Sequence, residues 1–296
     1  MNNTSIRPVD SELILIPTDF SEVAEYAIQH AVHLAKIFNK KLCLFHVVES
    51  GMFDSEKKII VQEAEAKTTL EQKAKEIGAE HGIDVKWLVY RGNIFEEIGN
   101  ASDKENASLV IMGTHGVKGM QHVVGSNALR VILNANRPFV VVQKRAIRPH
   151  GYKNIVLPID FSKETKQKLV WAAELSKAFK STFHIFAAYE SDEYANNAVK
   201  NNLAYAEEYL RDRGCNVHVA RSPKGDFSKE TIRYAATADA DLIIIMTHPE
   251  NDVAGFVFGA DEQDIIANDA QIPVMTLNPV DASVSVNGHL FNFSNF

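Results

Sequence analysis

The chain is poor in the features that would place it outside the cytoplasm or on a nucleic acid. Only two of its 296 residues are cysteine, Cys43 and Cys215, and neither has metal-binding or redox spacing. Apolar runs such as Leu13–Ile16 and Phe139–Val142 are far too short to span a bilayer. The first ten residues have no apolar core of a signal peptide. The formal net charge of −7 disfavours binding to nucleic acid or to an anionic membrane. We therefore expect a cytoplasmic protein without either partner.

Motifs for phosphoryl-transfer catalysis and for metal binding are also missing. The sequence has no Gly-x-x-x-x-Gly-Lys-Ser/Thr element, and no basic cluster or carboxylate pair faces its glycine-rich stretch. Zinc would need three or four converging ligands, and no such spacing occurs. His30 and His33 lie three residues apart, and we expect them on a solvated helix face. We therefore predict no catalytic residue and no metal ligand.

What the chain does have is short apolar runs that alternate with segments of helical periodicity. Uncharged apolar runs indicate buried strands, and apolar residues at every third or fourth position indicate amphipathic helices. This alternation predicts an α/β fold of βαβ units with a parallel sheet. In the first half we expect strands at 12–17, 41–48, 85–90, 109–112 and 139–142, and helices after Asp19 or Ser21, at about 56–81, at about 94–105 and from Asn127.

The same pattern then occurs a second time. Ile155–Ser162 repeats Ile14–Ser21 at an offset of 141, and Ala240–His248 repeats Ala107–His115 at an offset of 133. A repeat of this length indicates a duplicated domain. An Asn-Gly pair between short apolar runs further predicts a hairpin near the C-terminus, over 284–293. The predicted divisions are a first domain at 10–145, a linker at 144–151, a second domain at 152–280 and a C-terminal tail at 281–296.

One glycine-rich stretch of the first half has the pattern of a phosphate-binding loop. A buried apolar run ends at Gly113, and Gly116 and then Gly125-Ser126 follow before a helix from Asn127. Glycine lets backbone N–H groups approach a ligand closely, and a capped helix start attracts anions. A loop that only joins a strand to a helix is the alternative interpretation.

These residues resemble the universal stress protein family. Its nucleotide-binding members carry Gly, two residues, Gly, nine residues, then Gly-Ser or Gly-Thr, and here eight residues, Val117–Val124, separate the two parts. The run Pro17-Thr18-Asp19-Phe20-Ser21 at the end of the first strand and the pair His46-Val47 at the end of the second are also similar to the family. Together the two repeats extend this resemblance over about 12–279.

The resemblance implies both a fold and a ligand. The fold is two doubly wound five-stranded parallel-sheet domains of strand order 3-2-1-4-5, related by a pseudo-two-fold axis. The ligand is ATP, with Mg²⁺ as an optional companion, and Asp19 would contact the nucleoside. Asp19 has a second interpretation of equal weight, a capping box with Glu22 that Asp160 repeats. The residues implied at the ATP site are Pro17, Thr18, Asp19, Val47, Met112, Gly113, Gly116, Gly125, Ser126 and Asn127.

The second half departs from the loop pattern. Met246 and Pro249 replace the first two glycines, and Ala260 replaces the serine. Asp261 and Glu262 stand at the expected helix start, where carboxylates would repel a phosphate. We therefore expect no nucleotide at this loop.

Three functions remain open at this point. The first is a stress-response or regulatory protein that binds ATP in its N-terminal domain. The second is an enzyme, which the missing motifs limit to slow ATP hydrolysis assisted by Mg²⁺. The third is a protein-interaction module without a ligand. We also expect the fifth strands, 139–142 and 274–277, to pair antiparallel as an internal dimer, because unpaired apolar edges invite aggregation. The helical faces leave room for a further homodimer.

Overall fold

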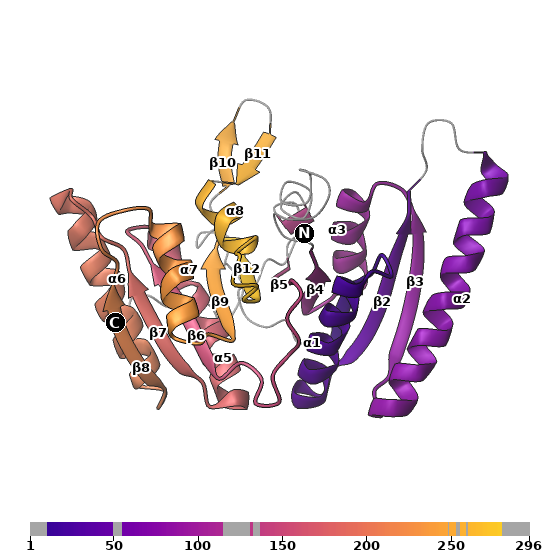
Figure 1. Cartoon of the computed structure of the whole chain (residues 1–296), viewed down its shortest axis with the longest axis horizontal. Coiled ribbons are helices and arrows are strands. Elements are labelled where there is room, and N and C mark those ends of the chain that lie inside the picture. Colours follow the sequence, from indigo (N-terminus) through magenta and orange to yellow (C-terminus); the bar gives the residue numbers. More distant parts are fainter. Residues whose placement is uncertain are drawn as a thin grey trace, which may run out of the picture.

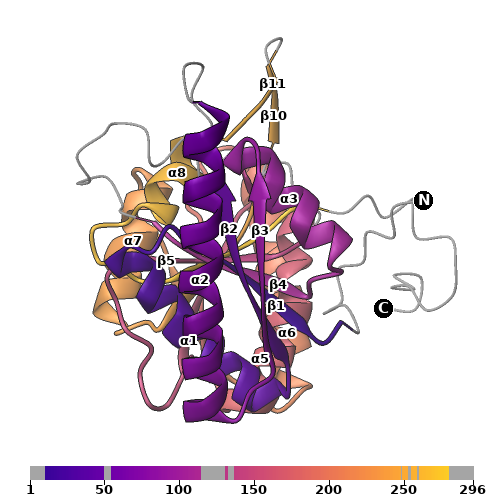
Figure 2. The same cartoon turned by 90° about the vertical axis from the view of Figure 1, so that its right-hand side faces the viewer.

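A single ten-stranded sheet runs through the molecule, with helices on both faces (Figure 1). The structure is a computed structural model of the chain. It describes residues 11–49, 55–114, 131–132, 137–247, 249–252, 255–258 and 260–279. Figure 2 looks at the sheet from the end formed by the first half of the chain.

The first half alternates strands with helices as the sequence predicts. Its second strand and its long helix have the predicted bounds, and the helix ends at Gly82, whose φ of +67° suits glycine. The elements are β1 (Leu13–Pro17), α1 (Glu22–Phe38), β2 (Lys41–Val48), α2 (Glu56–His81), β3 (Val85–Arg91), α3 (Ile94–Lys104), β4 (Leu109–Gly113) and β5 (Phe139–Val142). Val131 and Ile132 are helical.

The second half repeats this order with two changes. A short 3-10 helix precedes its first α-helix, and a two-stranded hairpin stands where the glycine-rich loop would be. The elements are β6 (Asn154–Ile159), η1 (Lys163–Lys166), α5 (Lys168–Phe179), β7 (Thr182–Ala187), α6 (Glu193–Arg211), β8 (Asn216–Arg221), α7 (Phe227–Thr237), β9 (Leu242–Met246), β10 (Pro249–Asp252), β11 (Gly255–Phe258), α8 (Ala260–Ile266) and β12 (Val274–Leu277).

The sheet order confirms the predicted topology. The strands run β3-β2-β1-β4-β5-β12-β9-β6-β7-β8, so each half has the order 3-2-1-4-5 counted from its own outer edge. Within each half, the strands of this sheet are parallel. One core cluster packs under α1, α2, α5 and α6, and the other packs under α3, α7 and α8 on the opposite face.

The two halves join through β5 and β12, as expected. These strands pair antiparallel, with Val140 opposite Met275. Two polar residues that follow them make corresponding contacts across the junction. The amide of Gln143 donates to the carbonyl of Ile266 in the second half, and the amide of Asn278 donates to the carbonyl of Ile132 in the first. The pairing relates the halves by a pseudo-two-fold axis and leaves neither fifth strand as an open edge.

The linker explains one wrong prediction. His30 does not lie on a solvated helix face but is only 1% exposed. Its Nε2 lies 3.0 Å from the carbonyl of Arg145, and its Nδ1 lies 2.7 Å from the hydroxyl of Tyr152. A carbonyl can only accept, so Nε2 carries the proton and Nδ1 accepts from Tyr152. Burial lowers the pKa of His30 to about 4, in keeping with a neutral ring. The linker is therefore fastened to α1.

Candidate functional site

The candidate crevice of the first half is the place where its strand order reverses, between β1 and β4. Strands β1 and β4 are neighbours, yet they pair only at Ile14 with Leu109 and at Leu15 with Val110. On its other side β1 stays paired with β2 as far as Pro17. The two strands therefore diverge toward their carboxyl ends. In an open α/β sheet this is the place where ligands bind.

The wall that follows β1 is held by hydrogen bonds to β2. The N–H of Thr18 donates to the carbonyl of Phe45 at 2.8 Å, and Nδ1 of His46 donates to the carbonyl of Thr18 at 2.8 Å. Phe20 then takes a φ of +64°, and its ring lies 4.7 Å from that of His46. A positive φ is uncommon for a bulky residue and clusters at functional sites. The chain thus turns sharply at the mouth of the crevice.

Asp19 has a different local role from the predicted capping box. Its Oδ1 accepts hydrogen bonds from the backbone N–H and the hydroxyl of Ser21. Ser21 is the N-cap of α1, and its own side chain caps nothing. Asp19 therefore fixes the turn before the helix and leaves the helix N–H groups alone. Asp160 repeats this turn with Ser162, at 2.9 and 2.7 Å. The side chain of Asp19 is exposed, and its Oδ2 has no hydrogen-bond partner in the described chain.

The opposite wall is the end of β4, where only glycine fits. A Cβ on Gly113 would lie 2.6 Å from the carbonyl oxygen of Val23 and 3.0 Å from the N of Ala24. The first turn of α1 therefore rests directly on the backbone of β4. The next residue, Thr114, is buried and donates its N–H to the carbonyl of Val142 at 2.8 Å.

The structure brings the described members of the predicted site together. Pro17, Thr18 and Asp19 end β1, Val47 lies near the end of β2, and Met112 and Gly113 end β4, so all six lie at one edge of the sheet. Val47 and Met112 are each 8% exposed and belong to the same core cluster. The other predicted residues, Gly116, Gly125, Ser126 and Asn127, lie outside the described residues.

The corresponding crevice of the second half is filled. Strands β6 and β9 also pair at only two positions, Ile155 with Leu242 and Val156 with Ile243. The buried ammonium group of Lys168 donates to the carbonyl of Pro158, near the end of β6. Burial lowers the pKa of Lys168 to about 8, although Asp160 raises it. Ala27 takes the place of this lysine in the first half, so the carbonyl of Pro17 has no such neighbour.

A second polar side chain, from α6, contacts the backbone that follows β6. The amide of Asn202 donates to the carbonyls of Asp160 and Ser162, at 2.9 Å each. Sequence analysis identified neither Lys168 nor Asn202. One signal was present in the sequence. Lys168 aligns with Ala27, which lies on the apolar face of the first helix, where a lysine is unusual.

The changed loop residue also explains the 3-10 helix. Met246 stands in the place of Gly113, where in the first half even a Cβ would lie 2.6 Å from the helix start, so a methionine is incompatible with that packing. The chain there forms η1 and begins α5 only at Lys168. The two crevices therefore differ at the first helix, where Lys168 replaces Ala27, and at the strand end, where Met246 replaces Gly113.

Two general features of the described residues bear on chemistry. None of their helices is long and apolar enough to cross a membrane. No group of three or more histidine, cysteine or carboxylate side chains among them could hold a metal ion.

Comparison with known proteins gives the same pattern in both halves. The model of the universal stress protein family matches residues 12–143 and again residues 151–278. The chain is 31% identical to Universal stress protein MJ0531 of Methanocaldococcus jannaschii over 141 residues, which is 44% of this chain and 81% of that protein. It is 30% identical to Universal stress protein MJ0577 of the same organism, over 45% of this chain and 94% of that protein.

A solved structure shares the whole two-domain fold. The crystal structure of a universal stress protein from Archaeoglobus fulgidus superimposes with a TM-score of 0.76 at 21% identity. The match covers 91% of this chain and 99% of that one. The sequence matches and the shared sheet order lead to the same conclusion: the chain belongs to the universal stress protein family and carries two of its domains in tandem.

Proposed function

We propose that this chain is a cytoplasmic regulatory protein whose first domain binds ATP and whose second domain does not bind nucleotide through its altered loop. The observation that carries the proposal is the contrast between the two crevices. In the first, β1 and β4 diverge, and small residues stand at Ala27 and Gly113. In the second, Lys168 and Met246 occupy those places. The proposed domain limits are 10–145 and 152–280, with 281–296 as a tail.

The proposed contacts divide between the two walls. Asp19, whose exposed Oδ2 is available, contacts the nucleoside, and Pro17 and Thr18 form the adjoining turn. Val47 offers its backbone to the adenine ring. The phosphates lie against the glycine-rich stretch, where N–H groups and a helix start attract anions. The residues proposed around the phosphates are Met112, Gly113, Gly116, Gly125, Ser126 and Asn127.

Two measurements test this proposal. Mass spectrometry of small molecules released from the purified protein should detect ATP. Titration calorimetry should then show ATP binding that Gly125→Asp weakens at least about 100-fold, because a carboxylate would stand against the phosphates. Gly259→Asp is the matched control at the corresponding glycine of the second domain, and it should leave the affinity unchanged. Titrations with and without EDTA show whether Mg²⁺ is needed.

Other outcomes would select the other functions. Absence of ATP binding in the unmodified protein would contradict the proposal and favour a ligand-free interaction module. Rapid release of phosphate would instead favour an enzyme. Equal loss of affinity in Gly125→Asp and Gly259→Asp would place the nucleotide elsewhere.

A further inference from the structure

A second cleft lies on the other side of the central strands from the ATP crevice. Its volume is about 1060 Å³, within the range of small-molecule sites. It lies between the helices α1 and α5, which flank the linker at the bottom of Figure 1. Ile14, Leu109 and Leu242 line it from the first half of their strands, whereas the crevices lie at the carboxyl ends. The two sites are therefore separate.

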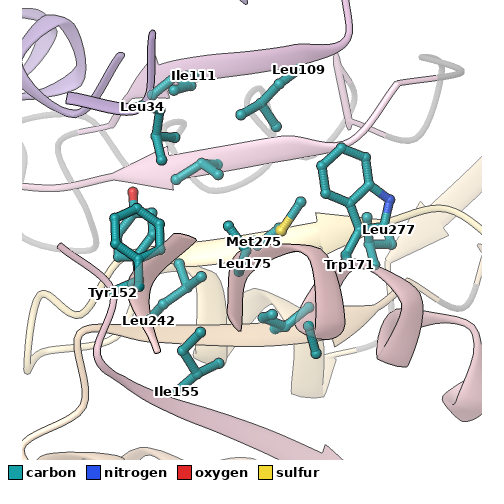
Figure 3. Packing of buried hydrophobic residues seen from close by; sticks show 14 of the residues in the cluster. Leu34, Leu109, Ile111, Tyr152, Ile155, Trp171, Leu175, Leu242, Met275 and Leu277 are labelled. Carbon is teal, nitrogen blue, oxygen red and sulfur yellow. The ribbon is translucent and has the colours of Figure 1, made fainter. Parts of the chain in front are cut away.

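The floor of this interdomain cleft is apolar and comes from both domains. Figure 3 shows buried side chains of both domains that pack together here, among them Leu34 and Leu109 from the first domain and Leu175 and Met275 from the second. The floor side chains are at most 8% exposed and belong to one core cluster, so a ligand would lie against the surface of this cluster. The main apolar lining residues are Leu34, Leu109 and Val140 from the first domain and Leu175, Leu242 and Met275 from the second.

The polar groups on the floor are already engaged within the protein. The hydroxyl of Ser108 donates to the carbonyl of Leu13 at 2.9 Å, and that of Ser181 donates to the carbonyl of Tyr152 at 2.7 Å. The Tyr152 hydroxyl donates to His30. The floor thus has few hydrogen bonds to offer a ligand. A polar ligand would lose its hydration there without replacement, whereas a hydrocarbon chain would not.

The rim, in contrast, is cationic. Four basic residues line the cleft, Lys40, Lys177, Lys180 and Arg213, against one carboxylate, Glu174. Within a chain of net charge −7 this is a local reversal of sign. Lys177 is paired with Glu174 at 2.6 Å, and the Lys40 ammonium donates to the carbonyl of Ser11.

Two of these cations remain available to a ligand. Arg213 lies over the Tyr209 ring at 3.5 Å and donates one N–H to a carbonyl, which leaves other donors of its guanidinium. Lys180 is exposed, and its ammonium has no partner among the described residues. Lys180 is also the C-cap of α5 with a φ of +53°, a position that Asn39 takes in the first domain.

We propose that this cleft binds a single-chain amphiphile with an anionic head, namely an acyl chain with a carboxylate or a phosphate group. The chain lies on the apolar floor between α1 and α5, and the head group lies at the rim near Lys180. The positive charge of the rim attracts the anionic head group. The floor favours the hydrocarbon chain, because its polar groups are already hydrogen-bonded within the protein. Because both domains build the floor, the tandem arrangement creates the site.

The two tryptophans of the chain make a direct test possible. Trp171 lines the cleft, whereas Trp87 lies on β3 at the outer edge of the sheet. In the Trp87→Phe protein, bromine-labelled stearate should quench the remaining emission saturably, with one molecule bound per chain. Unlabelled stearate should reverse the quenching. In the Trp171→Phe protein the same titration should leave the emission unchanged.

Variants of the rim separate an anion site from mere apolar adsorption. Lys180→Gln should weaken stearate binding about tenfold, the effect of losing about 1.4 kcal/mol of charge interaction. Lys57→Gln, on exposed α2, is the matched control and should have no effect. Comparison of stearate with an alkyl phosphate of equal length distinguishes the two head groups.

Three results would overturn the proposal. One is no quenching of Trp171 below the micellar concentration of the labelled stearate. Another is equal quenching in the Trp171→Phe protein. The third is equal binding of a brominated alcohol of the same length, unaffected by Lys180→Gln. These results are independent of ATP binding, which concerns the other site.

Discussion

At the residue scale, the position shared by Ala27 and Lys168 separates the two domains most clearly. Both side chains are buried on the first helix of their domain. Alanine is too short to reach the carbonyl of Pro17, whereas lysine carries an ammonium group to the carbonyl of Pro158. A buried cation is costly unless it is well paired. We infer that the second domain tolerates this cost because the lysine ties α5 to β6.

The pKa of Lys168 makes this cost measurable. It is about 8 in the folded chain against an ordinary value of 10.5, so between these values the unfolded state binds more protons. Stability therefore rises with pH over this window, by about 3 kcal/mol in total. In Lys168→Met this rise should be absent. The variant should therefore be more stable than the unmodified chain near pH 8, and the difference in stability should shrink as the pH rises to 10.5.

Urea unfolding at several pH values between 7.5 and 10.5 measures the difference. Lys163→Met is the matched control, because its side chain is 90% exposed, and it should keep the rise seen in the unmodified chain. If the stability of Lys168→Met rises with pH as steeply as that of the unmodified chain, burial of the Lys168 ammonium group does not lower the stability.

At the element scale, strands and long helices were predictable from the sequence. Strand β2 is an apolar run, and α2 ends at Gly82 because the last turn needs a left-handed residue. The predicted site residues at the ends of β1, β2 and β4 also lie together, because parallel strands end at one edge. The 3-10 helix η1 was missed, because the approach of a helix start to a strand end depends on the residue at that strand end, here Met246, which is distant in sequence. The hairpin β10–β11 was also missed, because from the altered loop residues we predicted only the loss of a phosphate site and no new structure.

The contact of α1 with β4 leads to a prediction for Gly113. Alanine there would place a Cβ against the backbone of Val23, which cannot rotate away as a side chain could. Gly113→Ala should therefore lower the free energy of unfolding by about 1–3 kcal/mol. It should also loosen the first turn of α1, seen as faster hydrogen exchange at Glu25 and Tyr26. Met246→Ala, at the corresponding strand end, should leave the exchange of α1 unchanged. Unaltered exchange in Gly113→Ala would mean that α1 does not rest on β4.

At the scale of the whole molecule, several contacts join the domains. Strand β5 pairs with β12, Gln143 and Asn278 reach across the junction, and the linker is fastened to α1. The strand pairing was predictable, because both fifth strands are apolar and would otherwise be open edges. The burial of His30 was not predictable, because its partners Arg145 and Tyr152 lie 115 and 122 residues away.

The His30 contact should make the assembled molecule sensitive to acid. The pKa of His30 is about 4 when folded and 6.5 otherwise, and burial is the main cause, with the nearby charges of His33 and Arg145 adding to it. Between these values the unfolded chain binds more protons, so stability falls as the pH drops from 6.5 to 4, by about 3 kcal/mol. Below pH 4 this contribution is lost completely.

Replacing His30 by glutamine should remove most of this acid sensitivity, because an amide can hydrogen-bond to both Tyr152 and the linker without titrating. His33, whose pKa burial also lowers, should keep a smaller slope. Urea unfolding at pH values from 7 to 4 measures both slopes, and Lys57→Gln, at an exposed position on α2, is the control that should retain the full slope. If His30→Gln loses as much stability on acidification as the unmodified chain, another group governs the acid response, and the buried linker contact is not the pH-sensitive part of the interdomain junction.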